Sequence, residues 1–156
     1  MTPKPMEMSQ PAFLLAQLGA HAAVQFAERL AALTLTPPDA GILRMLRARP
    51  GLSQQELAGL LRIHPSRLVA ILDNLEQRRY VVRKPNPDDR RLYSLHLTSE
   101  GEGVLKQIGE VAKKHQEALL AALNRAERDQ LAALLARIAD EQGLTRGVHP
   151  GYQRME

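Results

Sequence analysis

The 156-residue chain contains no cysteine. This absence excludes disulfides, thiolate nucleophiles, thiolate metal sites and direct thiol redox sensing. Tryptophan is also absent, and aromatic residues make up only 3% of the chain, although 44% of its residues are hydrophobic. The core must therefore be aliphatic. Its leucines and alanines favour helices, because both residues have high helix propensity.

Long hydrophobic runs and catalytic motifs are missing as well. No apolar run approaches the roughly 18 residues that a membrane span needs, and residues 1–11 lack the features of a secretion signal. The five histidines are scattered without metal-site spacing, and no glycine-rich phosphate loop or nucleophile elbow occurs. We therefore expect a soluble, cytoplasmic protein that is not an enzyme, has no catalytic residue, cofactor or metal, and does not contact membranes.

Positive charge is concentrated in one part of the chain. The whole sequence carries a net charge of +4. Residues 62–91 include eight basic and four acidic side chains, and eight minus four gives the same excess of +4. A localised basic patch is the electrostatic signature of a nucleic-acid-binding protein, although a solvated surface would have the same composition.

The first third of the chain is predicted to form two helices. Residues 1–10 resemble a loose arm, and apolar residues at helical spacing predict a helix over residues 12–34. A second helix is expected to begin after Thr36, because Thr36 can cap it, Pro37 suits its first position and Asp39 meets the positive end of its dipole. This helix is expected to end before Pro50.

A helix-turn-helix is predicted next. Ser53 and Glu56 form a capping box at the start of a short helix. Pro65 marks the first position of another helix, which is expected to run to about Arg78 and to place Arg78 and Arg79 at its end. Two short helices joined by a tight turn are typical of this DNA-binding motif.

The hydrophobic period then changes to that of strands. Residues 80–84 and 92–97 read as two strands, and the intervening PNPDDRR segment reads as a charged turn. A helix follows, capped by either Thr98 or Ser99, and extends to about residue 123; another begins after Asn124. The predicted hairpin would form a wing beside the helix-turn-helix.

The expected fold is mainly α with a small β-hairpin wing (α+β). The outer helices are longer than a DNA-binding lobe needs, and their apolar faces would be buried most economically in a symmetric dimer. We divide the chain into an N-terminal arm and dimerisation helix (1–35), a winged helix-turn-helix lobe (36–98), C-terminal dimerisation helices (99–143) and an irregular tail (144–156).

Residues 52–101 resemble the MarR family of bacterial winged helix-turn-helix regulators. The matching sequences are SQQELA at 53–58, the helix over 68–76, NPDDRR at 86–91 and LTSEG at 97–101. The resemblance implies a homodimeric, sequence-specific regulator of transcription that binds double-stranded DNA at a pseudo-palindromic operator. It further implies a repressor that a small aromatic or phenolic ligand releases. The alternatives are a constitutive architectural DNA-binding dimer and a protein-interaction dimer with an incidental basic face.

The candidate DNA contacts lie on the helix-turn-helix and the wing. The first turn of the second helix would enter the major groove, where Ser66 can bind a phosphate or a base edge and Arg67 can reach guanine or phosphate. The resemblance places Asp89 and Arg91 at the wing tip, with Arg91 entering the minor groove. The predicted contacts are Ser53, Gln54, Pro65, Ser66, Arg67, Arg83, Lys84, Asp89, Arg90 and Arg91, of which Arg83, Lys84 and Arg90 would contact phosphates.

Three positions depart from the family pattern. Many relatives carry an arginine in place of Ala70 and a basic residue in place of Asn74, so the recognition helix is less basic here. His64 stands where Asp or Ser often caps the helix. The resemblance also implies a ligand pocket between the dimer helices and the lobe, with Gln17, His21, Met45, Arg47 and His115 as its candidate lining.

Overall fold

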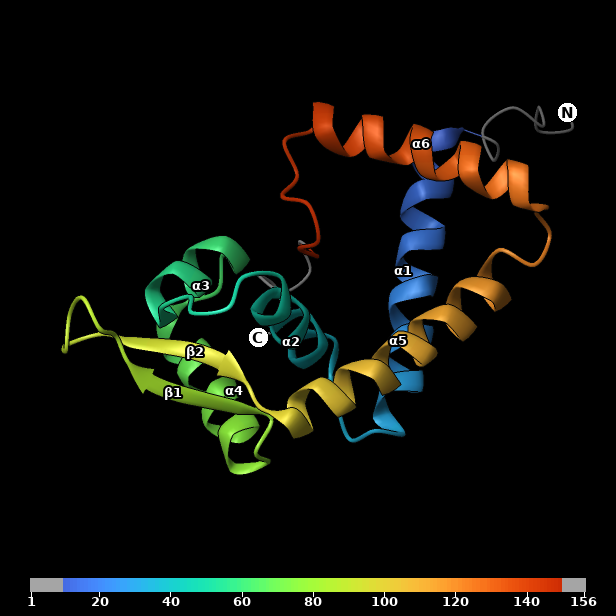
Figure 1. Cartoon of the computed structure of the whole chain (residues 1–156). Coiled ribbons are helices and arrows are strands. Elements are labelled where there is room, and N and C mark those ends of the chain that lie inside the picture. The colour runs from blue at the N-terminus through green and yellow to red at the C-terminus, as the bar shows by residue number, and fades with distance from the viewer. Residues whose placement is uncertain (1–9, 150–156) are drawn as a thin grey trace, which may run out of the picture.

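The computed structural model describes residues 10–149, which form six helices and one antiparallel hairpin (Figure 1). The elements are α1 (Pro11–Ala31), α2 (Pro37–Ala48), α3 (Gln54–Leu61), α4 (Pro65–Gln77), β1 (Val81–Pro85), β2 (Tyr93–Leu97), α5 (Ser99–Leu119) and α6 (Arg125–Glu141). Their order matches the one predicted from the sequence.

The predicted helix starts are capped as expected. Reciprocal capping boxes join Thr36 to Asp39, Ser53 to Glu56 and Asn124 to Glu127. Of the two candidate caps for α5, Thr98 is the one used, because its hydroxyl oxygen accepts a hydrogen bond from the backbone N–H of Gly101 at 3.0 Å. Ser99 is the first residue of the helix itself.

One aliphatic core holds the lobe together. It lies between α2, α3, α4, the hairpin and the first half of α5, and Leu30 from the end of α1 completes it. Its largest fully buried side chains are Leu30, Ile42, Leu43, Leu46, Leu57, Leu61, Leu68, Leu72, Leu75, Val81 and Leu95. None of these side chains is aromatic, which agrees with the 3% aromatic content of the sequence.

The hairpin is anchored to the helix-turn-helix by backbone pairing. The two strands pair antiparallel, with Val81 opposite Leu97. The N–H of Leu95 donates to Leu52 O at 2.8 Å, and its carbonyl accepts from Gly51 N at 3.0 Å. Residues that precede α3 therefore pair with the middle of β2 and hold the wing against the lobe.

The first helix ends three residues earlier than predicted. The helix stops at Ala31, and Thr34 takes a positive φ of 55°. This turn allows Leu35 to become buried, with only 3% of its surface exposed. The apolar spacing continued through the turn because Leu33 and Leu35 still face the core, so periodicity alone could not locate the helix end. The fifth helix likewise ends at Leu119 rather than near residue 123.

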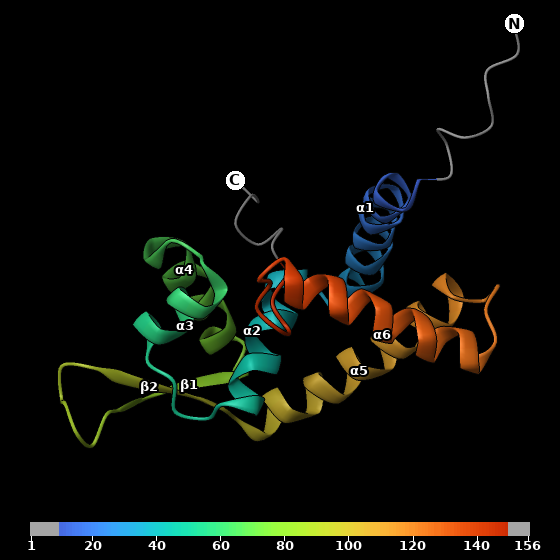
Figure 2. The same ribbon diagram turned by 90° about the horizontal axis from the view of Figure 1, so that it is seen from above.

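The outer helices extend away from the lobe and expose apolar side chains. Only Leu30 of α1 is buried, and no residue of α6 is buried. Figures 1 and 2 show that α6 begins at the far end of α5 and runs back, so that its C-terminal end lies on the side of α2. The exposed large apolar residues of these two helices are Phe13, Leu14, Leu15, Leu18, Val24, Leu134, Leu135 and Ile138. None of the helices within residues 10–149 is both long and apolar enough to cross a membrane.

Gly101, in the first turn of α5, lies against the backbone of Tyr80, the residue that precedes β1. A Cβ atom at this position would lie 2.1 Å from the carbonyl oxygen of Tyr80. That oxygen already accepts a hydrogen bond from Thr98 N at 3.1 Å, so it is held in place. Only glycine fits this close approach of α5 to the hairpin.

We expect Gly101→Ala to lower the free energy of unfolding by about 1–3 kcal/mol, because the methyl group would force the two backbones apart. Gly103→Ala is the matched control, since it lies in the same helix with nothing within 4 Å of its Cβ position. The control should be more stable than the wild type by about 0.5–1 kcal/mol. Urea unfolding at one protein concentration measures both, and equal stability of the two variants would contradict the assignment.

Candidate nucleic-acid interface

The second helix of the helix-turn-helix presents a polar face to solvent. Helix α4 buries Leu68, Leu72 and Leu75 in the core. Ser66 and Val69 in its first turns are exposed, as are Pro65, Ala70, Asp73 and Asn74 further round the helix. Arg67 is half-buried. An exposed polar face over an apolar one is the pattern of a helix that can lie in a major groove about 12 Å wide.

His64 caps this helix in place of the more common Asp or Ser. Its Nδ1 atom accepts a hydrogen bond from the backbone N–H of Ser66 at 3.3 Å and lies 2.7 Å from the Ser66 hydroxyl oxygen. Because Nδ1 accepts from the backbone N–H, the Ser66 hydroxyl beside it is placed to donate to the same nitrogen. The Ser66 oxygen is then left as a hydrogen-bond acceptor, suited to a base amino group.

The wing tip carries a side-chain pair made by Asp89 and Arg91. Arg91 Nε and Nη2 donate to the two carboxylate oxygens of Asp89, each at 3.1 Å, and Arg91 N donates to Asp89 Oδ1 at 3.0 Å. These bonds lower the pKa of Asp89 and raise that of Arg91. Asp89 is therefore ionised at neutral pH, and the pair persists while 89% of the Arg91 side chain stays exposed.

Lys84 and Arg90 are the other exposed cations of the wing. Lys84 lies on β1 and Arg90 in the loop that joins the strands. No ion pair involves either side chain within the described part of the chain. Both are therefore placed as phosphate contacts would require.

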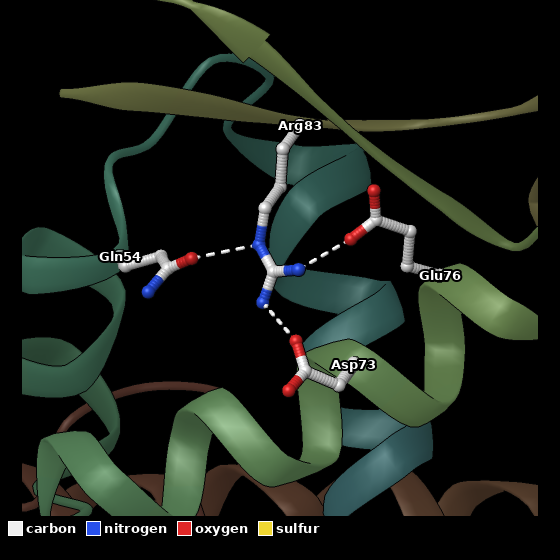
Figure 3. Close-up of polar contacts among 4 residues, drawn as sticks. All are labelled: Gln54, Asp73, Glu76 and Arg83. Atoms are coloured by element: carbon white, nitrogen blue, oxygen red, sulfur yellow. Dashed lines mark hydrogen bonds and ion pairs between the residues drawn. The ribbon is translucent and has the colours of Figure 1, made fainter.

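Arg83 is directed into the lobe rather than outward (Figure 3). Its Nε donates to Gln54 Oε1 at 2.7 Å, its Nη2 donates to Asp73 Oδ1 at 2.8 Å, and its Nη1 donates to a carboxylate oxygen of Glu76. Only 18% of its side chain is exposed. The phosphate contact expected of Arg83 stays a prediction, but its guanidinium is already bound to protein groups.

Two further residues of the basic segment and the helix-turn-helix are engaged inside the protein. Ser53, expected to contact DNA, is 7% exposed, and its hydroxyl oxygen accepts from Glu56 N at 3.1 Å. Arg78 donates to the carbonyl oxygens of Thr34 and Leu33 at 2.7 and 3.2 Å, and it lies 4.9 Å from the centre of the Tyr80 ring. Sequence reasoning missed this role of Arg78, because its partners lie more than 40 residues away.

The five candidate ligand residues lie on α1, α2 and α5. Met45 lines a groove of about 310 Å³ formed by α2, α3 and residues 145–147. Arg47, two positions along the same helix, projects in a different direction and forms an exposed ion pair with Glu102 at 3.8 Å. Gln17 and His21 are exposed on α1. The ligand pocket expected between the dimer helices and the lobe stays a prediction.

His115 is the most distinctive of these candidates. It packs against Phe26 with the ring centres 5.4 Å apart, and its Nδ1 atom is buried with no hydrogen-bond partner in the described structure. Burial, together with the positive charges of Arg29 and His21, lowers the pKa of His115. The imidazole is therefore neutral at neutral pH. Within residues 10–149, no cluster of three or more acidic or histidine side chains could hold a metal ion.

Comparison with known sequences identifies transcriptional regulators. The sequence profile described as the MarR family matches residues 33–92. The chain is 38% identical over 116 residues to the HTH-type transcriptional regulator FarR of Neisseria gonorrhoeae, covering 74% of this chain and 79% of that protein. It is 36% identical over 104 residues to a putative transcriptional regulatory protein for the hcr operon of Thauera aromatica, and the match covers 67% of this chain but only 63% of that protein.

Solved structures show the same fold. The transcriptional repressor CouR bound to a 23-mer DNA duplex superposes with a TM-score of 0.75 at 35% identity, over 89% of this chain and 99% of that one. A MarR family protein of Mycobacterium tuberculosis in complex with DNA superposes with a TM-score of 0.73 at 27% identity, over 83% and 98% of the two chains. The predicted fold class, mainly α with a hairpin wing, is confirmed.

Proposed function

This chain belongs to the MarR family of transcriptional regulators, and on that premise we propose that it is a homodimeric repressor that binds a pseudo-palindromic operator in double-stranded DNA. The observation that carries the proposal is the wing tip, where Asp89 fixes an otherwise exposed Arg91 guanidinium. A fixed, exposed guanidinium loses little conformational entropy on binding and suits the negative potential of a narrow minor groove. The DNA complexes of the related regulators support the same proposal.

The recognition helix would supply the base contacts. Pro65, Ser66 and Arg67 form its first turn, and N-terminal residues of such helices reach base edges in the major groove. Ala70 and Asn74 leave its middle without positive charge. Affinity would then depend more on the wing cations and the phosphate contacts of Lys84 and Arg90.

The homodimer would form through the outer helices. Helix α6 buries none of its residues within the protomer, yet carries a stripe made by Leu131, Leu134, Leu135 and Ile138. A second copy would cover this stripe and the exposed apolar residues of α1. Two-fold symmetry would place the two recognition helices on half-sites about one helical turn apart.

Ligand control would act through the spacing of the two lobes. The buried Nδ1 of His115, which has no hydrogen-bond partner in the described structure, would give a small phenolic or aromatic ligand a polar contact beside the Phe26 ring once α1 and α5 moved apart to admit the ligand. A ligand that favours one spacing of the lobes would shift the population away from the DNA-bound form. Full operator affinity at saturating ligand would contradict this mechanism.

Selection of bound sequences from random duplex DNA tests the proposed function against its alternatives. The purified protein should enrich one palindrome and bind it about 10³-fold or more tightly than random DNA. An architectural DNA-binding protein would show steep salt dependence without that preference, and a protein-interaction dimer would show neither. Either of these results would contradict the proposal.

We expect Arg91→Ala to weaken operator binding by about 1–3 kcal/mol, because it removes the minor-groove contact. The matched control is Arg90→Ala, which removes the same charge from the neighbouring exposed position. It should weaken binding to operator and random DNA alike and reduce the salt slope by about 0.9. Fluorescence anisotropy across several salt concentrations measures both variants. Equal loss of sequence discrimination in the two variants would reject the assignment of Arg91 to the minor groove.

We expect Leu134→Glu to convert the dimer to monomers, because a carboxylate in the apolar stripe would be buried without a partner. Ala133→Glu adds the same charge to an exposed position on the opposite side of α6 and serves as the control. Sedimentation equilibrium measures the mass of each variant, and the Leu134 variant should also bind the operator about a hundredfold more weakly. A dimeric Leu134→Glu protein would place the interface elsewhere.

A further inference from the structure

Arg83 connects three elements of the winged helix-turn-helix lobe. The side chain leaves β1, and its guanidinium binds Gln54 at the start of α3 and both Asp73 and Glu76 on α4 (Figure 3). The two carboxylates lie three positions apart, so they occupy neighbouring sites on one face of the helix. One guanidinium group therefore connects the wing strand β1 to α3 and to the recognition helix α4.

The charge balance of this cluster opposes a direct role in DNA binding. One guanidinium faces two carboxylates, so the three side chains together carry a net negative charge. Asp73 and Glu76 are 54% and 42% exposed, respectively, and would repel a nearby phosphate. Arg83 itself is only 18% exposed, and three of its five N–H groups are already used.

We propose that Arg83 is a positioning residue that sets the angle of the wing against the recognition helix, and that Asp73 and Glu76 are its partners in this role. The inference rests on the proposed DNA-binding function. The short antiparallel hairpin is also joined to the lobe through the middle of β2, where Leu95 pairs its backbone with Gly51 and Leu52, the residues before α3. Arg83 is the strand partner of Leu95, so its side chain adds a contact from β1 at the same level of the hairpin, and this contact reaches α4 as well as α3.

The same contact orients Gln54. Because Gln54 Oε1 accepts from Arg83 Nε, its amide nitrogen is left to donate. Gln54 is the first residue of α3, so its amide group would donate to a DNA phosphate from a fixed position. Arg83 therefore supports the predicted contact of Gln54 as well as that of Arg91.

A double substitution that removes both carboxylate charges tests the proposal, because positioning and electrostatics predict opposite changes in DNA affinity. Asp73→Asn/Glu76→Gln makes the surface more positive by two charges, so electrostatics alone predicts tighter DNA binding. We expect instead that the palindrome recovered by selection binds about tenfold more weakly, because the wing loses its fixed angle. Asp88→Asn removes an exposed carboxylate that makes no ion pair within the described residues, and it should bind slightly more tightly. Tighter binding by the double variant would overturn the proposal.

Arg83→Lys separates positioning from a phosphate contact. Lysine binds phosphate as a point charge but cannot form the same three-pronged contact. We expect Arg83→Lys to lose about as much affinity as Arg83→Gln and to lose little more when combined with Arg91→Ala, since both act through the wing. Rescue by lysine, or additive losses with Arg91→Ala, would overturn the positioning role.

Hydrogen exchange without DNA keeps this test independent of the proposed function. Backbone amides of β1 and β2 should exchange at least several-fold faster in Arg83→Gln than in the wild type, while those of α2 remain unchanged. Unchanged exchange in the strands would overturn the proposal even if DNA binding were confirmed. A wild-type protein that binds no DNA would contradict the proposed function alone, because the exchange measurement would still report whether Arg83 holds the wing.

Discussion

The structure of the DNA-binding lobe depends on how a two-stranded hairpin is held by helices. A hairpin of this size has little stability of its own in water. Here Leu95 buries its side chain in the aliphatic core and pairs its backbone with Gly51 and Leu52. At the base of the hairpin, the close approach of Gly101 to the carbonyl oxygen of Tyr80, the residue before β1, joins the hairpin to α5. The base of the wing is therefore packed into the core, and only the part of the hairpin nearer its tip projects from the lobe.

Some arginines of the basic segment bind groups inside the protein and others are exposed, and composition alone cannot distinguish the two. Arg78 and Arg83 are turned inward, where they bind carbonyl oxygens and carboxylates. Arg90 and Arg91 are exposed in the loop that joins the strands. Arg83 adds to the net charge of the segment but contributes little to the field at the surface, because Asp73 and Glu76 offset its charge. The DNA-binding potential proposed for this protein therefore comes from fewer cations than the sequence total suggests.

Local signals in the sequence predicted most of the fold. Capping boxes such as that of Ser53 and Glu56 depend on residues three positions apart, and the structure contains them as expected. The pairing of Asp89 with Arg91 is local in the same way. The contacts of Arg83 and Arg78 could not be predicted, because Gln54 and the partners of Arg78 are far away in the sequence and only the tertiary fold turns Asp73 and Glu76 of α4 toward β1. The end of α1 was misplaced for a related reason, since Leu35 is buried by the turn and not by the helix.

The division between one well-packed lobe and largely exposed outer helices has a consequence for regulation. Within the lobe, the core, the hairpin pairing and the Arg83 contacts restrain the recognition helix and wing relative to each other. Helix α6 has no buried residue of its own, so its position in the proposed dimer would be set by the second copy. A ligand that binds near His115, between α1 and α5, would then leave the DNA-reading surface of each lobe intact and change only the distance between the two lobes. Because two half-sites would have to be bound together for high avidity, a change in that distance would be sufficient to release the proposed operator.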